Sequence, residues 1–284
     1  MSEHMALDHA LTIVLVEAIR QNRPKMVEML LAMGANPRTS SGLPLVAVVV
    51  EGKGVHTPSG ELPLVAAVRE GQEQTVRILL DAKADVNARS FGVMSNGGGG
   101  QGGGREGGVK PLFTAIECRQ QDMAQRLCKQ LLDHGADPNA WRYIPQYGTL
   151  QLTALHILLL DDHLRLDLVE TLVEAKASLE PMQNSPVPLI LAAQRRSTRA
   201  LKWLLEHKAD VTLADHAGDT ALHWAAWDHY PKAIRLLMDA KADLTARNKK
   251  GHTPIQCASA SDGGGSDRDA ALTILKRTEE WFPF

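Results

Sequence analysis

The fold is decided by residues 218–253, GDTALHWAAWDHYPKAIRLLMDAKADLTARNKKGHT. Asp219 and Thr220 can end a turn and cap a helix, because a Thr side chain accepts a hydrogen bond from the free N–H groups of the first turn. Apolar residues then recur at helical spacing over 221–226, and a second, more apolar helix is predicted over 233–238. A polar turn follows, and the pattern begins again. The stretch therefore holds one helix–turn–helix unit and the start of the next.

This pattern recurs along almost the whole chain. The second helix ends in a similar way six times, and the first helix begins in a similar way seven times. A fixed period of this length is the signature of a repeat architecture. The endings are MVEMLLAMGAN (26–36), TVRILLDAKAD (75–85), LCKQLLDHGAD (127–137), LVETLVEAKAS (168–178), ALKWLLEHKAD (200–210) and AIRLLMDAKAD (233–243). The starts are VLVEAI (14–19), PLVAAV (63–68), PLFTAI (111–116), ALHILL (154–159), PLILAA (188–193), ALHWAA (221–226) and PIQCAS (254–259).

In its period and in the TALH segments at 153–156 and 220–223, the chain resembles the ankyrin repeat family, whose hallmark is Thr-Pro-Leu-His. The resemblance implies a mainly α solenoid with short β-hairpins, built as a single domain over 1–284. It also implies that His156 and His223 bond to backbone and brace neighbouring hairpins. The implied repeats span approximately 8–42, 58–89, 110–140, 149–180, 184–213, 217–246 and 250–282.

Two segments do not fit the repeat. The β-branched run and the Gly-Lys-Gly turn within 43–57 favour an extended β-hairpin finger. However, LPLVAVVVEG (43–52) echoes LPLVAAVREG (62–71), which a half-repeat would explain, and both interpretations stay open. The glycine-rich segment 90–109 cannot bury enough apolar surface to order itself and is predicted to be a flexible loop.

The chain departs from the family at the end of the second helix. Ankyrin repeats usually place Gly there in a left-handed conformation, and only Gly34 and Gly135 keep it. A residue with a side chain is expected to lose about 1 kcal/mol in this conformation. The substituted residues are Lys83, Lys176, Lys208 and Lys241.

Bulk properties narrow the class of protein. The net charge of −2 provides no field that would attract nucleic acid or an anionic membrane. No apolar run is long enough to span a membrane, and three cysteines cannot form a disulfide framework. We therefore expect an intracellular protein, cytoplasmic or nuclear, with no nucleic-acid partner and no membrane insertion.

No catalytic, cofactor or metal site is predicted, and the chain is not expected to be an enzyme. Adjacent helical residues such as Asp228 and His229 point in different directions, so they do not form an acid–base pair. Cys118 and Cys128 lack the close spacing of a zinc site. The segment around Asn87 resembles ankyrin segments that are hydroxylated at Asn, and this modification stays an open question.

Binding residues are expected on the first helices, because the resemblance implies a concave groove lined by these helices and the hairpin tips. Trp227 aligns with the polar Arg69 and Gln194, which predicts that its side chain is exposed in the groove. Trp224 aligns with Ala66 and is predicted to be a core residue. The predicted groove positions are Arg20, Gln21, Arg69, Glu70, Glu117, Cys118, Leu160, Asp161, Gln194, Arg195, Trp227 and Asp228.

Exposed Trp, Tyr and Arg together are typical of interaction hot spots, so repeats five and six are the predicted partner-binding patch. The alternative is that Trp227 packs under the hairpin of repeat five. A second candidate is the aromatic connector that contains Trp141, Tyr143 and Tyr147. The alternative is that these rings close a small satellite core. The predicted patch contains Arg195, Arg196, Trp227, Asp228 and Tyr230.

The function predicted from the sequence is a non-catalytic protein–protein interaction module, an adaptor or scaffold. Its partner would carry an acidic or carboxylate-rich segment, because the patch is rich in Arg. The free chain would then be a monomer. The alternative is a constitutive structural subunit of a larger complex, which would be aggregation-prone alone.

Overall fold

The computed structural model describes residues 2–38, 49–50, 53–54, 62–90, 109–143, 150–161, 163–181, 185–261 and 265–279. The chain divides into two compact units, which are described separately. Unit 1 comprises Met1–Tyr143 and Leu166–Lys176, and unit 2 comprises Ile144–Arg165 and Ala177–Phe284.

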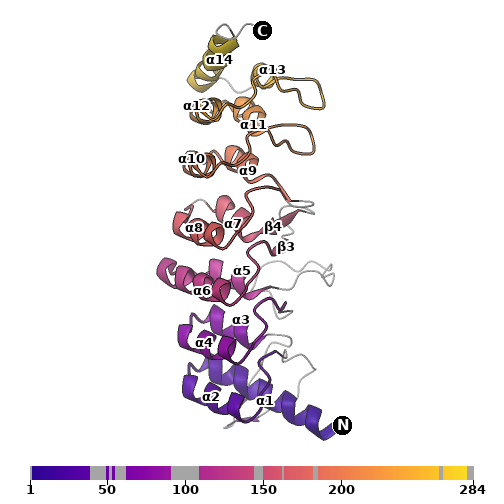
Figure 1. The fold of residues 1–284 in the computed structure, drawn as a ribbon, viewed down its shortest axis with the longest axis vertical. Coiled ribbons are helices and arrows are strands. Elements are labelled where there is room, and N and C mark those ends of the chain that lie inside the picture. The colour runs from indigo at the N-terminus through magenta and orange to yellow at the C-terminus, as the bar shows by residue number, and fades with distance from the viewer. Residues whose placement is uncertain are drawn as a thin grey trace. The chain divides into compact units, whose positions relative to one another are not determined.

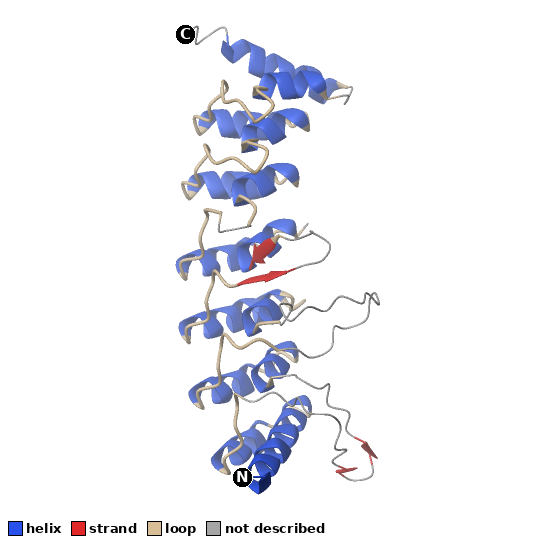
Figure 2. Ribbon diagram, turned by 90° about the vertical axis from the view of Figure 1, so that its right-hand side faces the viewer, coloured by secondary structure: helices blue, strands red, loops and turns tan. Residues whose placement is uncertain are grey.

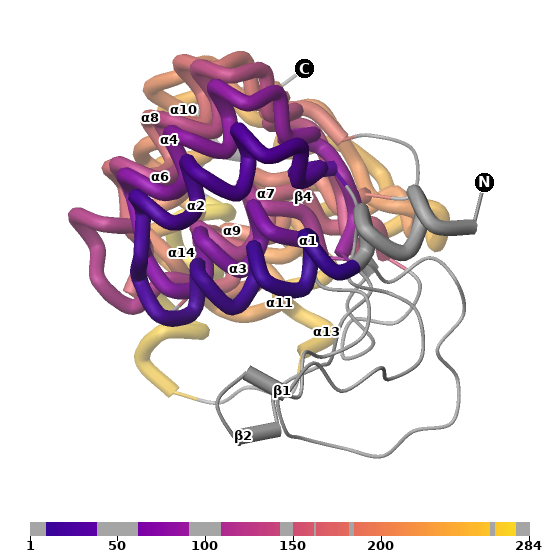
Figure 3. Tube along the Cα trace, turned by 90° about the horizontal axis from the view of Figure 1, so that it is seen from below, coloured from indigo at the N-terminus to yellow at the C-terminus, as the bar shows by residue number. Residues whose placement is uncertain are grey.

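Unit 1 consists of helix pairs that follow one another along the chain, together with the second helix of the following repeat (Figure 1). Its first helices are α1 (Ser2–Arg20), α3 (Pro63–Arg69) and α5 (Pro111–Ile116). Its second helices are α2 (Pro24–Ala32), α4 (Glu73–Asp81), α6 (Gln121–Asp133) and α8 (Leu166–Glu174). First helices pack on first helices and second helices on second helices, and Figure 3 shows α1 and α3 in one row beside α2, α4 and α6 in the other.

Unit 2 repeats this arrangement (Figures 1 and 2). Its first helices are α7 (Ala154–Leu160), α9 (Pro188–Gln194), α11 (Ala221–Trp227) and α13 (Pro254–Ala260). Its second helices are α10 (Thr198–Glu206), α12 (Pro231–Asp239) and α14 (Ser266–Glu279). The short strands are β1 (Val49–Val50), β2 (Lys53–Gly54) and β3 (Trp141–Tyr143) in unit 1, and β4 (Gln151–Thr153) in unit 2. The mainly α fold predicted from the sequence is confirmed.

The core lies between the two rows of helices in each unit. The first helices α3 and α9 are almost wholly buried, because each has a helix of the same row on both sides and its own second helix behind it. All six residues of α5 are buried, as are the first six of α9. Small residues such as Ala192 and Ala193 allow this close approach.

Histidines brace the turns before two first helices. His156 accepts a hydrogen bond at Nδ1 from the backbone N–H of Thr153, and its Nε2 lies 2.8 Å from the carbonyl oxygen of Pro186. His223 repeats this geometry with Thr220 and with the carbonyl oxygen of His252, 3.1 Å away. The bracing role implied by the resemblance is therefore confirmed.

The second helices end as predicted. Gly34 and Gly135 have φ of 97° and 87°, which lie in the left-handed region. The four lysines at the same position are confirmed in this region too, so each carries backbone strain that glycine would not. Their φ angles are 65° at Lys83, 72° at Lys176, 62° at Lys208 and 65° at Lys241.

Replacing Lys208 or Lys241 by Gly is therefore expected to raise the free energy of unfolding by about 0.5–1 kcal/mol for each change. The gain is smaller than the strain itself, because Gly also gives the unfolded chain more freedom and the helix loses a cation at its C-terminus. Urea unfolding of both variants measures the effect. The matched control is Lys202→Gly at an exposed position inside α10, which should destabilise by about 1 kcal/mol. Destabilisation by all three changes would contradict the prediction.

The two irregular segments fall mostly outside the described residues. Within 43–57, β1 and β2 pair antiparallel, with Val49 opposite Gly54 and Val50 opposite Lys53. The rest of that segment is outside the described part of the chain, so the choice between a finger and a half-repeat remains a prediction. At the ends of the glycine-rich segment, Ser90 and Val109 exchange backbone hydrogen bonds of 2.9 Å. Residues 91–108 are outside the described part, and the flexibility of this loop also remains a prediction.

Candidate functional site

Trp227 ends α11 with 49% of its side chain exposed, which confirms the exposure predicted from its alignment. It is the only large aromatic side chain so exposed among the described residues of unit 2. The other predicted groove positions are also accessible to solvent, because none of the twelve is buried. Their access to solvent is confirmed, and their role in binding remains a prediction.

Trp224 is only partly buried, so its prediction as a core residue is wrong. Its indole Nε1–H donates to Oδ2 of Asp215 over 2.9 Å. The other carboxylate oxygen of Asp215 accepts from the backbone N–H groups of Ala217 and Asp219. The indole is held at the surface because it has a polar partner there, which Ala66 cannot have.

Arg196 and Asp228 bind each other. The Nη1 of Arg196 donates to Oδ2 of Asp228 over 2.9 Å and to its backbone carbonyl over 2.8 Å. Nη2 lies 3.7 Å from the carboxylate of Asp267, and the guanidinium stacks 4.7 Å from the centre of the Tyr230 ring. Arg196 therefore links the turns of three successive repeats, and this patch braces the fold around Trp227.

Tyr230 is buried, with 6% exposure, so the prediction that it is an exposed hot-spot residue is wrong. Its O–H donates to the carbonyl oxygen of Arg196 over 2.8 Å and also contacts the hydroxyl of Thr198. The cause is its register, because Tyr230 aligns with Gln72, whose amide donates to the carbonyl of Ile19 in the repeat before it. Both side chains bind the backbone of the preceding repeat, and the sequence comparison between them could have found this role.

His229 is buried as well, and its Nε2 lies 2.9 Å from the carbonyl oxygen of Ala258 in the next repeat. The backbone φ is 44° at His229 and 53° at Arg196, both in the left-handed region. A left-handed residue between the two helices turns the chain sharply. Trp227 thus stands on a surface whose supporting turns are fixed on both sides.

The hairpin tips before α11 and α13 are locked together. The side-chain oxygen of Asn248 accepts from the N–H groups of Lys250 and His252, and its amide donates to Asp219 over 2.7 Å. Gly218 has a φ of 80°, and a Cβ there would lie 2.9 Å from the backbone nitrogen of Lys249. Only glycine allows this approach, which holds two adjacent tips in register. Sequence reasoning missed the device, although Asp215 and Asn248 stand at matching places, each three residues before a glycine.

Arg195, at the matching turn of the repeat before Trp227, is exposed, and its Nη2 donates to the carbonyl oxygen of Leu160 over 3.1 Å. The carboxylate of Asp228, next to Trp227 in the chain, is paired with Arg196. Lys249 and Lys250 are also exposed, but they lie on the tip beside Gly218, at the other end of α11 from Trp227.

The second candidate, the aromatic connector, lies largely outside the described side chains. Trp141 is partly buried, with the guanidinium of Arg89 5.3 Å from its ring centre. The side chains of Tyr143 and Tyr147 are outside the described part. Both interpretations of this connector therefore remain predictions.

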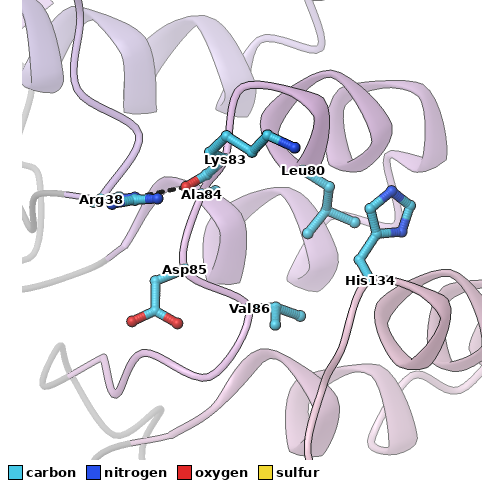
Figure 4. Close-up of a pocket in the computed structure, with 7 residues that line it drawn as sticks. All are labelled: Arg38, Leu80, Lys83, Ala84, Asp85, Val86 and His134. Carbon is cyan, nitrogen blue, oxygen red and sulfur yellow. Dashed lines mark hydrogen bonds between the residues drawn. The ribbon is translucent and has the colours of Figure 1, made fainter.

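One pocket of about 450 Å³ lies in unit 1 beside the end of α4 (Figure 4). Arg38 donates from Nε to the carbonyl oxygen of Lys83 over 2.7 Å at its edge. Its lining is mixed, with basic side chains from three repeats and the carboxylate of Asp85, and sequence reasoning missed it because no single motif contains them. The lining residues are Arg38, Leu80, Lys83, Ala84, Asp85, Val86 and His134.

Residues with chemical potential elsewhere have structural partners. Asn87 donates to the carbonyl oxygen of Gly135 and accepts from the N–H of Asp137, each over 2.9 Å. Burial and the nearby Asp219 raise the pKa of the Cys257 thiol, which makes it a poorer nucleophile. Among the residues that the structure describes, no three His, Cys, Asp or Glu side chains are grouped to hold a metal ion. None of the described helices is both long and apolar enough to span a membrane.

Comparison with known proteins agrees with this fold. The family model for ankyrin repeats (3 copies) matches residues 14–141, 127–215, 155–248 and 189–279. The human ASB11 ankyrin repeat domain is a similar solved structure, with 23% identity, a TM-score of 0.57 and coverage of 92% of this chain and 96% of that one. The ankyrin repeat domain of Bcl-3, described as a unique member of the IkappaB protein family, has 21% identity, a TM-score of 0.65 and coverage of 92% and 97%. No curated protein matches the sequence. The matches of the family model cover most of the chain, which therefore belongs to the ankyrin repeat family.

Proposed function

We propose that this chain is a non-catalytic interaction module whose main contact is made by Trp227. Ankyrin repeat domains are generally protein–protein interaction modules, and the family match extends through the repeats that carry this residue. The observation that carries the proposal is a large aromatic side chain left half exposed at the end of α11. Exposed aromatic residues of this kind are enriched at interaction hot spots.

The surroundings of Trp227 favour binding over mere exposure. Arg196, Tyr230 and His229 fix the turns on both sides of it, so the surface is already ordered before a partner arrives. A preorganised surface loses less conformational entropy on binding and therefore binds more tightly.

The charges around Trp227 favour a carboxylate-rich partner segment. Arg195 is exposed at the matching turn of the preceding repeat, while the neighbouring Asp228 is paired with Arg196. Complementary charge speeds association and selects among partners more than it adds affinity. The partner's apolar or aromatic group would pack on Trp227, and its carboxylates would lie toward the cations.

Affinity purification with wild-type and Trp227→Ala baits, read by mass spectrometry, tests this proposal. The partner should be lost from the variant, because truncating a hot-spot residue costs about 2–4 kcal/mol, or roughly 30- to 1000-fold in affinity. Arg235→Ala, at an exposed position of α12 in the same repeat, should retain the partner. The thermal melt of Trp227→Ala should stay close to that of the wild type because the side chain is exposed. If the two baits retain the same proteins, the proposal is wrong.

A further inference from the structure

Thr198, the first residue of α10, lies in a basic stretch of the chain. Residues 195–199 read RRSTR, and Arg195, Arg196 and Arg199 are all exposed. Thr198 is the one Ser or Thr of the sequence with Arg both two and three residues before it. Kinases that select basic substrates recognise such a charge pattern, because carboxylates in their clefts pair with the arginines. The sequence around Thr198 therefore has the charge pattern of a phosphorylation site.

The side chain of Thr198 begins a chain of hydrogen bonds between two repeats. Its hydroxyl contacts that of Tyr230, which in turn donates to the carbonyl oxygen of Arg196 over 2.8 Å. Because the Tyr230 proton is used in that bond, the Thr198 hydroxyl is the donor in the contact between the two hydroxyls. Tyr230 is buried, whereas Thr198 is only partly buried. Thr198 is therefore the end of this chain that is open to solvent.

The guanidinium of Arg196 lies beside this pair of hydroxyls. Its central carbon is 4.7 Å from the centre of the Tyr230 ring, whose oxygen contacts Thr198. Its present partners are the carboxylates of Asp228 at 2.9 Å and Asp267 at 3.7 Å, which are 42% and 67% exposed and so hold it weakly. A phosphate carries a charge of about −2 and can accept two parallel hydrogen bonds from one guanidinium. A phosphate on Thr198 would therefore bind Arg196 more strongly than these carboxylates do.

We propose that Thr198 is a phosphorylation site and that its phosphate takes Arg196 away from Asp228. The co-reactant is ATP, bound by a serine/threonine kinase that selects basic substrates. The hydroxyl oxygen of Thr198 attacks the γ-phosphorus, the bond from that phosphorus to the leaving oxygen of ADP breaks, and the hydroxyl proton passes to the catalytic carboxylate of the kinase. The new phosphate pairs with Arg196, and the carboxylate of Asp228 loses its partner.

This exchange changes the charge beside Trp227. Asp228 follows Trp227 directly in the chain, and Arg196 balances its carboxylate in the unmodified protein. Once Arg196 is bound to the phosphate, an unpaired carboxylate stands next to Trp227 and repels a carboxylate-rich partner. Phosphorylation thus weakens binding at the Trp227 surface. This consequence rests on the proposed function, whereas the modification of Thr198 and the capture of Arg196 do not.

The site is tested by incubating the folded full chain with ATP and a kinase that selects arginine-rich substrates, and by locating the phosphate with tandem mass spectrometry. One phosphate is expected on Thr198. Thr198→Val should take up none, whereas Ser197→Ala, which removes the adjacent hydroxyl, should still be modified at Thr198. The proposal is overturned if the folded chain takes up no phosphate, if the phosphate lies on Ser197, or if Thr198 is modified only after heat denaturation.

The capture of Arg196 is tested by urea unfolding of Asp228→Asn in the unmodified and the phosphorylated form. In the unmodified chain this change removes the pair with Arg196 and should lower the urea midpoint. In the phosphorylated chain the pair is already broken, so the loss should disappear. Asp239→Asn, at an exposed position of α12, is the matched control and should act equally in both forms. An equal loss from Asp228→Asn in both forms means that the phosphate leaves Arg196 in place, and the proposal is wrong.

Binding is measured with the partner recovered on the wild-type bait. The phosphorylated chain should bind it at least about tenfold more weakly than the unmodified chain does. Equal affinities would overturn the effect on binding. If Trp227→Ala keeps the partner, the proposed function fails, while the mass and urea measurements on Thr198 and Arg196 still decide the modification. The two failures are therefore distinguishable.

Discussion

His156→Ala is expected to lower the free energy of unfolding by about 3–5 kcal/mol at neutral pH. The side chain is 1% exposed, and its removal leaves a cavity between two repeats. It also leaves two backbone groups without their partners, the buried N–H of Thr153 and the partly buried carbonyl of Pro186. An unsatisfied buried polar group costs about 1–3 kcal/mol, so the cavity and the orphaned groups act in the same direction.

The matched variant is His156→Gln. Gln256 occupies the equivalent position in the first turn of α13, where its Oε1 accepts from the N–H of Thr253 over 2.8 Å. Glutamine at 156 should therefore keep the bond to Thr153 and lose the one to Pro186, at a cost of about 1 kcal/mol. Urea unfolding of both variants measures the difference. Equal losses of stability in the two variants would contradict separate contributions from the Nδ1 of His156, which caps the helix, and its Nε2, which bonds to the next repeat.

The stability of the wild-type protein and that of His156→Gln are expected to depend differently on pH. Burial lowers the pKa of His156 below its ordinary value near 6.5, and the bond to Pro186 opposes this shift only in part. The unfolded chain then binds a proton at a higher pH than the folded chain does. The stability that depends on the neutral imidazole is fully present above pH 6.5 and falls as the pH drops below it. His156→Gln removes this titration, so stability should fall less steeply between about pH 7.5 and about pH 5 than it does in the wild type. If the free energy of unfolding falls equally steeply with pH in the two proteins, the prediction is wrong.

The positions that sequence reasoning placed correctly are those where the repeat itself sets the backbone. The lysines in left-handed turns and the bracing histidines follow from the resemblance to the ankyrin repeat, whose turns are placed on this chain by counting along each repeat. Trp227 was placed correctly for a related reason. Its equivalents Arg69 and Gln194 are polar, so the position faces solvent in each repeat that was compared.

Contacts between one repeat and the next could not be read in the same way. Tyr230 follows a left-handed residue that turns it inward, and its partner is a carbonyl group 34 residues earlier in the chain. Met26 and Met29 of α2 and Met33 at its end show a different limit, because they are apolar at helical spacing and are nevertheless 40%, 65% and 68% exposed. Hydrophobic periodicity gives the direction of a side chain and says nothing about the neighbour it meets.

Tyr230→Ala is expected to lower the free energy of unfolding by about 3–5 kcal/mol, as is usual when a buried aromatic residue is truncated. The variant loses the packing of the ring, the bond to the carbonyl of Arg196 and the surface on which the Arg196 guanidinium stacks. Tyr230→Phe keeps the ring and loses only the hydroxyl, which should cost about 1 kcal/mol. Trp227→Ala, three residues away but half exposed, should change the stability by less than about 0.5 kcal/mol. Urea unfolding of the three variants is the measurement.

This series separates the two roles that the sequence alone assigned to one patch. If Tyr230 is a bracing residue, Tyr230→Phe should keep nearly all partner binding, since the ring still supports Arg196 and the turn before α12. Trp227→Ala should show the opposite behaviour, with normal stability and weakened binding. A stable Tyr230→Ala protein that has lost its partner would instead return Tyr230 to the binding surface. The left-handed turn at His229 argues against that result, because it directs the next side chain into the space between the repeats, where the carbonyl of Arg196 accepts its hydrogen bond.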